Sequence, residues 1–178
     1  MFKYKDIQIN ALLGDITDAN VDAIVNAANN TLLGGGGVDG AIHRVGGKRI
    51  LEQCKRIGGC PTGESRITTA GNLPSKYVIH TVGPIYKNGK EREKGLLYNS
   101  YYNSLILAKE YNIKTIAFPS ISTGAYGYPI EEAMKIAIRA VIDFIDKEEF
   151  DLDITFVLFN KEDYSLYNNY LKEKFLQY

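Results

Sequence analysis

Apolar residues recur with two different periods along this chain, and stretches of the two kinds alternate. A period of two across residues 3–13, carried by Ile7, Ile9 and Ala11, predicts a first β-strand. Further runs predict strands at residues 22–27, 66–70, 76–82, 115–118 and 154–159. Helical spacing predicts helices at residues 38–45, 48–57, 95–111 and 161–175, and a long helix opened by Pro129. This alternation favours one three-layer α/β domain over residues 1–178, with helices on both faces of a largely parallel sheet.

Ligands of such sheets bind outside the carboxyl ends of the strands. Four segments that follow predicted strands are rich in residues that contact ligands: 14–17, 29–39, 120–127 and 159–160. We therefore expect these four segments to converge on one site.

The second of these segments contains four consecutive glycines, residues 34–37, between a strand and a helix start near Val38. Glycines let the backbone approach an anion, and the unpaired amides of a helix start point at it, so this segment predicts a phosphate cradle. A flexible hairpin or linker is the alternative for the glycines taken alone. A Walker A loop is excluded because Arg49 follows Gly47-Lys48, and the G-x-G-x-x-G match of residues 35–40 begins too far from the strand.

The third segment, S-T-G-A-Y-G at residues 122–127, also combines small side chains and glycines after a strand. It could form a second nest of amides, and two nests on adjacent loops would suit a diphosphate. A structural turn is the alternative. In the outer segments, Asp15 would cap a short helix or accept a hydrogen bond from an amino group such as that of adenine. Phe159 would stack on a base or lie in the core.

Asp39 and His43 are four residues apart and share a helix face. Asp39 is either a partner of the helix dipole or a base that orients or activates water. We expect His43 to be hydrogen-bonded to Asp39, and His80, inside an apolar strand, to be a core residue. Asn29 offers an amide that could hold a sugar hydroxyl or a water.

The composition argues against several classes of protein. The 21 basic and 21 acidic residues balance, whereas a protein that binds the nucleic-acid backbone usually carries a basic excess. Cys54 and Cys60 show neither a disulfide framework nor metal-ligand spacing, and Ser122 lacks the G-x-S-x-G setting of a nucleophile. The N-terminus has no apolar signal region, and no run approaches the roughly 20 apolar residues of a membrane span, so we expect a cytoplasmic protein.

Several strings, in this order and spacing, resemble a macrodomain: G-D-I-T, I-V-N-A-A-N, L-L-G-G-G-G-V-D-G-A-I-H-R, I-H-T-V-G-P and F-P-S-I-S-T-G-A-Y-G-Y-P. The match covers residues 5 to 170 and is similar above all to the MacroD-type class of ADP-ribosyl hydrolases and O-acetyl-ADP-ribose deacetylases. Ala125 stands where a valine is common in this class, and Asn160 where an aspartate is common. The resemblance implies a mixed sheet of six or seven strands between helices, with ADP-ribose in a cleft at its crest.

The resemblance also implies roles for single residues. Asp15 would bind the adenine amino group with help from the Ile16 amide, and Phe159 would line the base. Two loops would enclose the diphosphate and the distal ribose, with these residues: Gly36, Gly37 and Val38 in the first, and Ser122, Thr123, Gly124, Ala125 and Tyr126 in the second. Asn29 and Asp39 would lie at the distal ribose, where hydrolytic members of the class cleave.

The implied activity is hydrolysis of the ester that joins the distal ribose to acetate or to a protein carboxylate. Asp39 would activate or orient the water, or place the ribose so that the phosphate of the substrate does so, and Asn29 would fix the ribose hydroxyls. No cofactor or metal is implied, and we expect a monomer that acts on ADP-ribose esters and mono-ADP-ribosylated proteins, without a membrane partner. A non-catalytic ADP-ribose reader and an ADP-ribose 1''-phosphate phosphatase are the alternatives. An RNA-binding module is disfavoured by the zero net charge.

Overall fold

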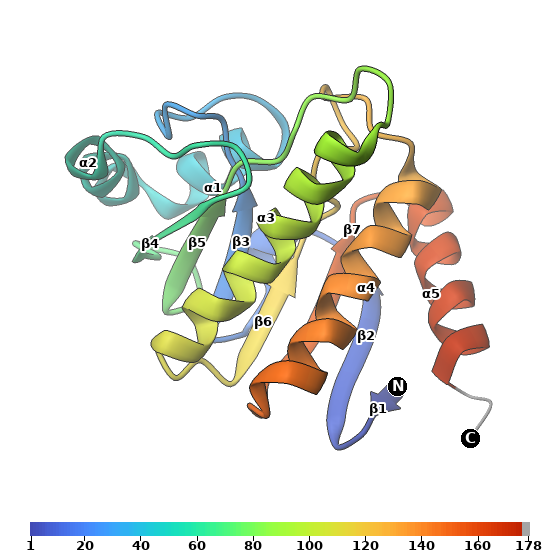
Figure 1. Cartoon of the computed structure of the whole chain (residues 1–178). Helices are drawn as coiled ribbons and strands as arrows, with labels where there is room; N and C mark the ends of the chain where they lie inside the picture. Colours follow the sequence, from blue (N-terminus) through green and yellow to red (C-terminus); the bar gives the residue numbers. More distant parts are fainter. Residues whose placement is uncertain (176–178) are drawn as a thin grey trace.

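The computed structural model describes residues 1–175, which form a seven-stranded sheet between two layers of helices (Figure 1). The strand order is β1-β2-β7-β6-β3-β5-β4. The five inner strands are parallel to one another, and the edge strands β1 and β4 are antiparallel to their neighbours. The strands are β1 Phe2–Tyr4, β2 Ile7–Leu13, β3 Ala23–Ala27, β4 Ser65–Thr69, β5 Tyr77–Thr81, β6 Thr115–Phe118 and β7 Asp153–Leu158. The predicted mixed, three-layer α/β architecture is confirmed.

The helices divide between the two faces of the sheet. The helices are α1 Gly37–Gly46, α2 Lys48–Ile57, α3 Glu91–Glu110, α4 Ile130–Glu148 and α5 Lys161–Phe175. Helices α3, α4 and α5 cover one face, and Figure 1 shows α3 and α4 crossing in front of the strands. Helices α1 and α2, with the short 3-10 helix η1 (Ile16–Asp18), cover the other face.

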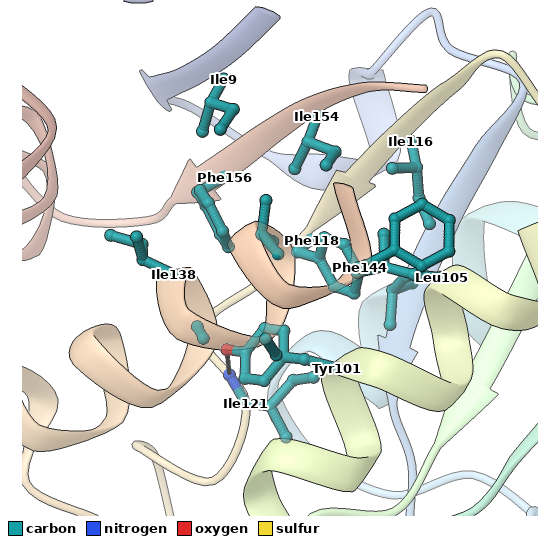
Figure 2. Packing of buried hydrophobic residues seen from close by; sticks show 14 of the residues in the cluster. Ile9, Tyr101, Leu105, Ile116, Phe118, Ile121, Ile138, Phe144, Ile154 and Phe156 are labelled. Carbon is teal, nitrogen blue, oxygen red and sulfur yellow. Dashed lines mark hydrogen bonds between the residues drawn. The ribbon is translucent and has the colours of Figure 1, made fainter. Parts of the chain in front are cut away.

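Successive side chains of each inner strand enter opposite cores because a strand has a period of two. In β7, Ile154 and Phe156 join the larger core, and Val157 joins the smaller one under α1 and α2. Figure 2 shows Ile9, Ile116, Ile154 and Phe156 of the strands facing Leu105, Ile138 and Phe144 of the helices. Each such side chain contributes about 1.5–3 kcal/mol when fully buried. The two cores therefore hold the helical layers against the two faces of the sheet.

The stretch predicted as one strand, residues 3–13, contains two strands joined by a turn. Residues 3–13 form the antiparallel hairpin of β1 and β2, whose pairing joins Tyr4 to Ile7. The turn depends on Lys5, which has a positive φ of 52°. A lysine in the left-handed region is uncommon, and the sequence gives no glycine or asparagine to mark this turn. The prediction of one continuous strand was therefore wrong.

The charged segment before α3 is also different from the prediction. The helix begins at Glu91 and not at Gly95, so part of the predicted polar loop 87–94 is the first helical turn. Acidic residues stabilise a helix start, and Glu93 accepts hydrogen bonds from the amides of Lys87, Asn88 and Gly89. These bonds hold the pKa of the Glu93 carboxyl below its ordinary value. Within residues 1–175, none of the helices is long and apolar enough to cross a membrane.

Candidate functional site

A cavity of about 320 Å³ opens where β3 and β6 end, between the start of α1 and the loop that follows β6. Its wall contains nine of the residues predicted for the site: Asn29, Gly36, Gly37, Val38, Asp39, Ser122, Gly124, Ala125 and Tyr126. Four others, Asp15, Ile16, Thr123 and Phe159, lie outside this wall. The fold thus brings the two glycine-containing loops together around one space, although more than 80 residues of the chain separate them.

The first loop is held by the side chain of Asn29. Its Oδ1 accepts hydrogen bonds from the amide and hydroxyl of Thr31, at 3.1 and 2.6 Å. Its Nδ2 donates to the carbonyl of Gly34 at 2.9 Å. Leu32 has a positive φ of 60° and a buried side chain, so it pins the same loop to the smaller core. Asn29 therefore shapes the loop in addition to lining the cavity.

Close backbone packing explains two of the glycines in this region. A Cβ added at Gly40 would lie 2.5 Å from the carbonyl oxygen of Gly35, which no ordinary side chain tolerates. A Cβ added at Gly35 would lie 3.1 Å from Asp39 Oδ2 and 3.5 Å from Asn29 Nδ2. Because α1 begins at Gly37, its first amides have no acceptor within the helix. The loop therefore presents backbone donors at the cavity wall, close to one carboxylate.

The second loop is anchored from beneath by α3. The Tyr101 hydroxyl accepts a hydrogen bond from the Ile121 amide at 3.0 Å, drawn as a dashed line in Figure 2, and donates to the Pro119 carbonyl at 3.4 Å. The next residue, Ser122, has a positive φ of 67°, and its buried hydroxyl has no hydrogen-bond partner among residues 1–175. A side chain at Gly83 would collide with that hydroxyl and with Ile121.

The amides of the second loop are largely unpaired. The loop closes through Gly127, whose amide donates to the Gly124 carbonyl, and through Tyr128, whose amide donates to the Ser122 carbonyl. In the described part of the chain, the amides of residues 123–126 find no acceptor. Backbone donors of this kind in a turn make a concavity for an anion. Both walls of the cavity can therefore hold a phosphate without a lysine or arginine.

Asp39 is the charged side chain in the cavity wall, and it is only 5% exposed. Its Oδ1 accepts a hydrogen bond of 2.8 Å from Nδ2 of Asn26, a fully buried residue of β3. His43 Nε2 lies 3.3 Å from the same oxygen, close enough for an ion pair, but the geometry gives no hydrogen bond. The prediction that His43 is hydrogen-bonded to Asp39 was therefore wrong. Asn26 takes that place.

Sequence reasoning missed Asn26 as part of the site because the residue stands inside an apolar strand. The available signal was its amide, because a polar side chain in a buried strand needs a partner. It also missed three wall residues outside the predicted segments: Ala27, Ala28 and Gly83. Gly35, Ser120 and Ile121, also in the wall, lie within the predicted segments but were given no individual role.

His80 is fully buried, which confirms the prediction of a core histidine. Burial, together with the neighbouring His43, lowers its pKa to about 3, so the ring is neutral at pH 7. Burial also raises the pKa of Cys54 to about 11, which keeps this thiol protonated. Among residues 1–175, no three His, Cys, Asp or Glu side chains come together in a way that could hold a metal ion.

Of the other predicted residues, Thr123 lies in the second loop, where its hydroxyl donates to Ser120. Asp15, Ile16 and Phe159 follow the ends of β2 and β7. Asp15 caps η1, since its Oδ1 accepts from the amide and hydroxyl of Thr17 at 2.9 and 2.7 Å. Ile16 is buried in the smaller core. Phe159 is 84% exposed, so the alternative that placed it in the core was wrong. Its neighbour Asn160 accepts a hydrogen bond from the Asp163 amide in the first turn of α5.

The fold and this cavity define an α/β domain with a cleft, lined by unpaired backbone amides, at the carboxyl ends of its strands. A family model for the Macro domain matches residues 25–137. A macro domain-containing protein of Caldanaerobacter subterraneus is 55% identical over 93% of this chain and 97% of its own. The chain therefore belongs to the macro domain family.

Two further relatives carry informative names. A protein of Escherichia fergusonii named O-acetyl-ADP-ribose deacetylase is 50% identical over 94% of this chain and 97% of its own. The structure of a mutant Oceanobacillus iheyensis macrodomain with ADPR superimposes with a TM-score of 0.91 at 43% identity, over 98% of this chain and 97% of that one.

Proposed function

We propose that this chain binds ADP-ribose in the cavity and hydrolyses esters at its distal ribose, as a MacroD-type enzyme. The observation that carries the proposal is the buried Asp39 carboxylate in the wall of a cavity that otherwise offers backbone amides. The amides alone could hold an anion, and a carboxylate beside it weakens that binding by repulsion. The presence of Asp39 at this place therefore suggests a task other than binding. The deacetylase relative and the ADPR-bound neighbour support this assignment.

In the proposed complex the diphosphate lies between the two loops. The amides at the start of α1, around Gly36, Gly37 and Val38, would donate to one phosphate. The amides of residues 123–126 would donate to the other phosphate and to the distal ribose. The Ser122 hydroxyl, which lacks a protein partner in the described chain, would gain one in the ligand.

The adenine would lie outside the cavity, over the ends of β2 and β7. Asp15 would accept a hydrogen bond from the exocyclic amino group through the oxygen that does not cap η1, and the Ile16 amide would assist. Phe159, which exposes most of its ring, would stack on the base.

In the proposed reaction, the oxygen of a water attacks the carbonyl carbon of the acyl group on the distal ribose. The bond between that carbon and the ribose oxygen breaks, and the proton lost by the water ends on the ribose oxygen. The products are ADP-ribose and a carboxylic acid, which is acetate or the side chain of a protein. Asp39 would orient or deprotonate the water with Oδ2, because Oδ1 is held by Asn26. Asn29 would hold the ribose hydroxyls.

The test is hydrolysis by the full chain of three substrates: O-acetyl-ADP-ribose, a protein mono-ADP-ribosylated on glutamate, and ADP-ribose 1''-phosphate. Titration with free ADP-ribose establishes binding in the same preparation. The proposal expects turnover of both esters by a protein that we place in the cytoplasm as a monomer. Tight binding without turnover would leave a reader, and turnover of the phosphate alone would leave a phosphatase.

A further inference from the structure

A chain of buried polar side chains leads from Asp39 across three strands. Asn26 of β3 and His80 of β5 are paired in the parallel register, and both are fully buried. Asn26 Nδ2 lies 3.1 Å from His80 Nδ1, in addition to its 2.8 Å bond to Asp39. On the other side of the ring, His80 Nε2 lies 2.9 Å from Thr68 Oγ1 in β4. The active-site carboxylate is thus linked to the edge strand of the sheet.

The directions of the hydrogen bonds in this chain follow from Asp39. Its carboxylate can only accept, so Asn26 Nδ2 donates one hydrogen to Asp39 and has the other for His80 Nδ1, which leaves the ring proton on Nε2. Thr68 Oγ1 then accepts from Nε2–H, while its own hydroxyl donates to the Thr69 carbonyl at 2.9 Å. A neutral ring with its proton on Nε2 has a lone pair on Nδ1. That lone pair accepts from one hydrogen of Asn26 Nδ2, and the second hydrogen goes to Asp39 Oδ1.

The orientation of the Asn26 amide depends on this acceptor. A flipped amide would direct its oxygen at the Asp39 carboxylate and at the lone pair of His80, and both contacts would be repulsive. A protonated ring would direct an N–H at the amide hydrogens instead. Burial prevents that state, since it lowers the pKa of His80 to about 3. The side chains around the ring are His43 from α1, Cys54 from α2, Asn26 from β3 and Thr68 from β4.

We propose that His80 is a positioning residue for Asp39: through Asn26 it holds Oδ1 in place and leaves Oδ2 for the attacking water. This inference rests on the proposed function, since it assigns a partner to the same carboxylate. His80 is not in the wall of the cavity, so its effect on the reaction passes through Asn26. Thr68 belongs to the same unit because its hydroxyl oxygen accepts from Nε2–H and so stabilises this tautomer of the ring.

The test compares Thr68→Val, Thr68→Ser and His80→Leu with the wild-type chain. Valine matches threonine in shape and removes only the hydroxyl, and serine keeps the hydroxyl. For hydrolysis of O-acetyl-ADP-ribose we expect Thr68→Val and His80→Leu to lower kcat, by up to about 100-fold, because a small misplacement of a catalytic group can cost that much. The Kd for free ADP-ribose should not change. Thr68→Ser should restore kcat to near the wild-type value.

Two outcomes would overturn the proposal. One is an unchanged kcat in Thr68→Val and His80→Leu, with turnover by the wild type and folding shown by cooperative unfolding. The other is a fall in kcat that is no larger in Thr68→Val than in Thr68→Ser.

A second measurement does not depend on activity, so it separates this proposal from the proposed function. Nitrogen chemical shifts of the His80 ring report which nitrogen carries the proton. We expect a proton on Nε2 alone in the wild type and a mixture of tautomers in Thr68→Val. A proton on Nδ1 in the wild type would contradict the proposed hydrogen-bonded chain from Asp39 to Thr68, even if the wild type hydrolyses neither ester. If the tautomer is as expected but the wild type shows no turnover, the proposed function and the catalytic part of this inference are refuted. The hydrogen-bonded chain from Asp39 to Thr68 would still stand.

Discussion

The hydroxyl of Tyr101 holds the amide of Ile121 at 3.0 Å, although the two residues lie on a helix and on a loop twenty positions apart. Both groups are buried, and the same hydroxyl reaches the Pro119 carbonyl. The loop that forms one wall of the cavity is thus fixed to α3 at its root. Helix α3, which has no residue in the cavity wall, therefore helps to position the amides of residues 123–126.

Removing this hydroxyl tests that connection. Tyr101→Phe leaves the Ile121 amide buried without an acceptor, which should lower the free energy of unfolding by about 1–3 kcal/mol. The loop amides should lose alignment, so the affinity for ADP-ribose should fall. Tyr102→Phe is the matched control, because the Tyr102 hydroxyl bonds Glu148 on α4 and not the loop. Denaturant unfolding and calorimetric titration measure both effects. Equal affinities in the two variants would contradict the account.

Gly40 supplies a test of the first wall. Gly40→Ala places a methyl group against the Gly35 carbonyl, so loop and helix must separate at a cost of about 1–3 kcal/mol. We expect lower stability and weaker binding of ADP-ribose, because the amides at the start of α1 move with the loop. Gly95→Ala in α3 is the control, since its new methyl group meets open space. That variant should be more stable by about 0.4–1 kcal/mol and bind normally. A Gly40→Ala protein that binds normally would refute the close-packing argument.

His80 makes a prediction about acid stability. Its pKa is about 3 in the fold, below the ordinary value of 6.5, because burial disfavours the charged ring. The unfolded chain therefore binds a proton that the folded chain does not, and the stabilisation present above pH 6.5 is lost as the pH falls toward 3. Within this window the slope is about 1.4 kcal/mol per pH unit. His80→Leu should show a shallower loss of unfolding free energy between pH 6.5 and 4, measured by urea titration. Parallel curves for the two proteins would disprove the assignment, because the carboxylates are common to both.

The adenine assignment can be tested through Asp15. Asp15→Asn keeps an oxygen that accepts from Thr17, so the cap of η1 should survive. The negative charge toward the amino group of the base is lost, and affinity for ADP-ribose should fall by about 10–100-fold, as expected for a hydrogen bond to a charged group. The variant should gain affinity for inosine diphosphate ribose, whose base carries a carbonyl in place of the amino group. Calorimetric titration with both ligands gives the ratio. An unchanged ratio would place the base elsewhere.

Much of this fold was readable from the sequence because the apolar periods of its elements differ so clearly. Strands such as β6 and helices such as α2 were predicted to within a residue or so, and the start of α4 was predicted at Pro129. The exceptions have local causes. The hairpin between β1 and β2 turns on a lysine with positive φ, which no composition rule marks. The first turn of α3 is as charged as a loop because acidic residues suit a helix start.

The site was predictable where the chain itself brings residues together and not where tertiary packing does so. The glycine loop and Asp39 are neighbours in sequence, so their placement at one cavity wall followed from the motif. The bond between Asn26 and Asp39 joins a strand to a helix, and the link from Asn26 to His80 joins two strands. Such contacts depend on strand order and register, which the sequence alone did not reveal. The exposure of Phe159 likewise depends on where β7 ends.

The measurement that tests the central claim most directly is kcat for O-acetyl-ADP-ribose with Asp39→Asn beside the wild type, with the Kd for ADP-ribose from each. Asparagine can still accept from Asn26 through one oxygen, so the variant removes the charge and the free carboxylate oxygen with little change of shape. Asp18→Asn, at an exposed aspartate of η1, is the control. The account predicts a fall in kcat of at least about 100-fold in Asp39→Asn, with binding retained. A kcat equal to that of the wild type, in a variant that binds ADP-ribose, would contradict it.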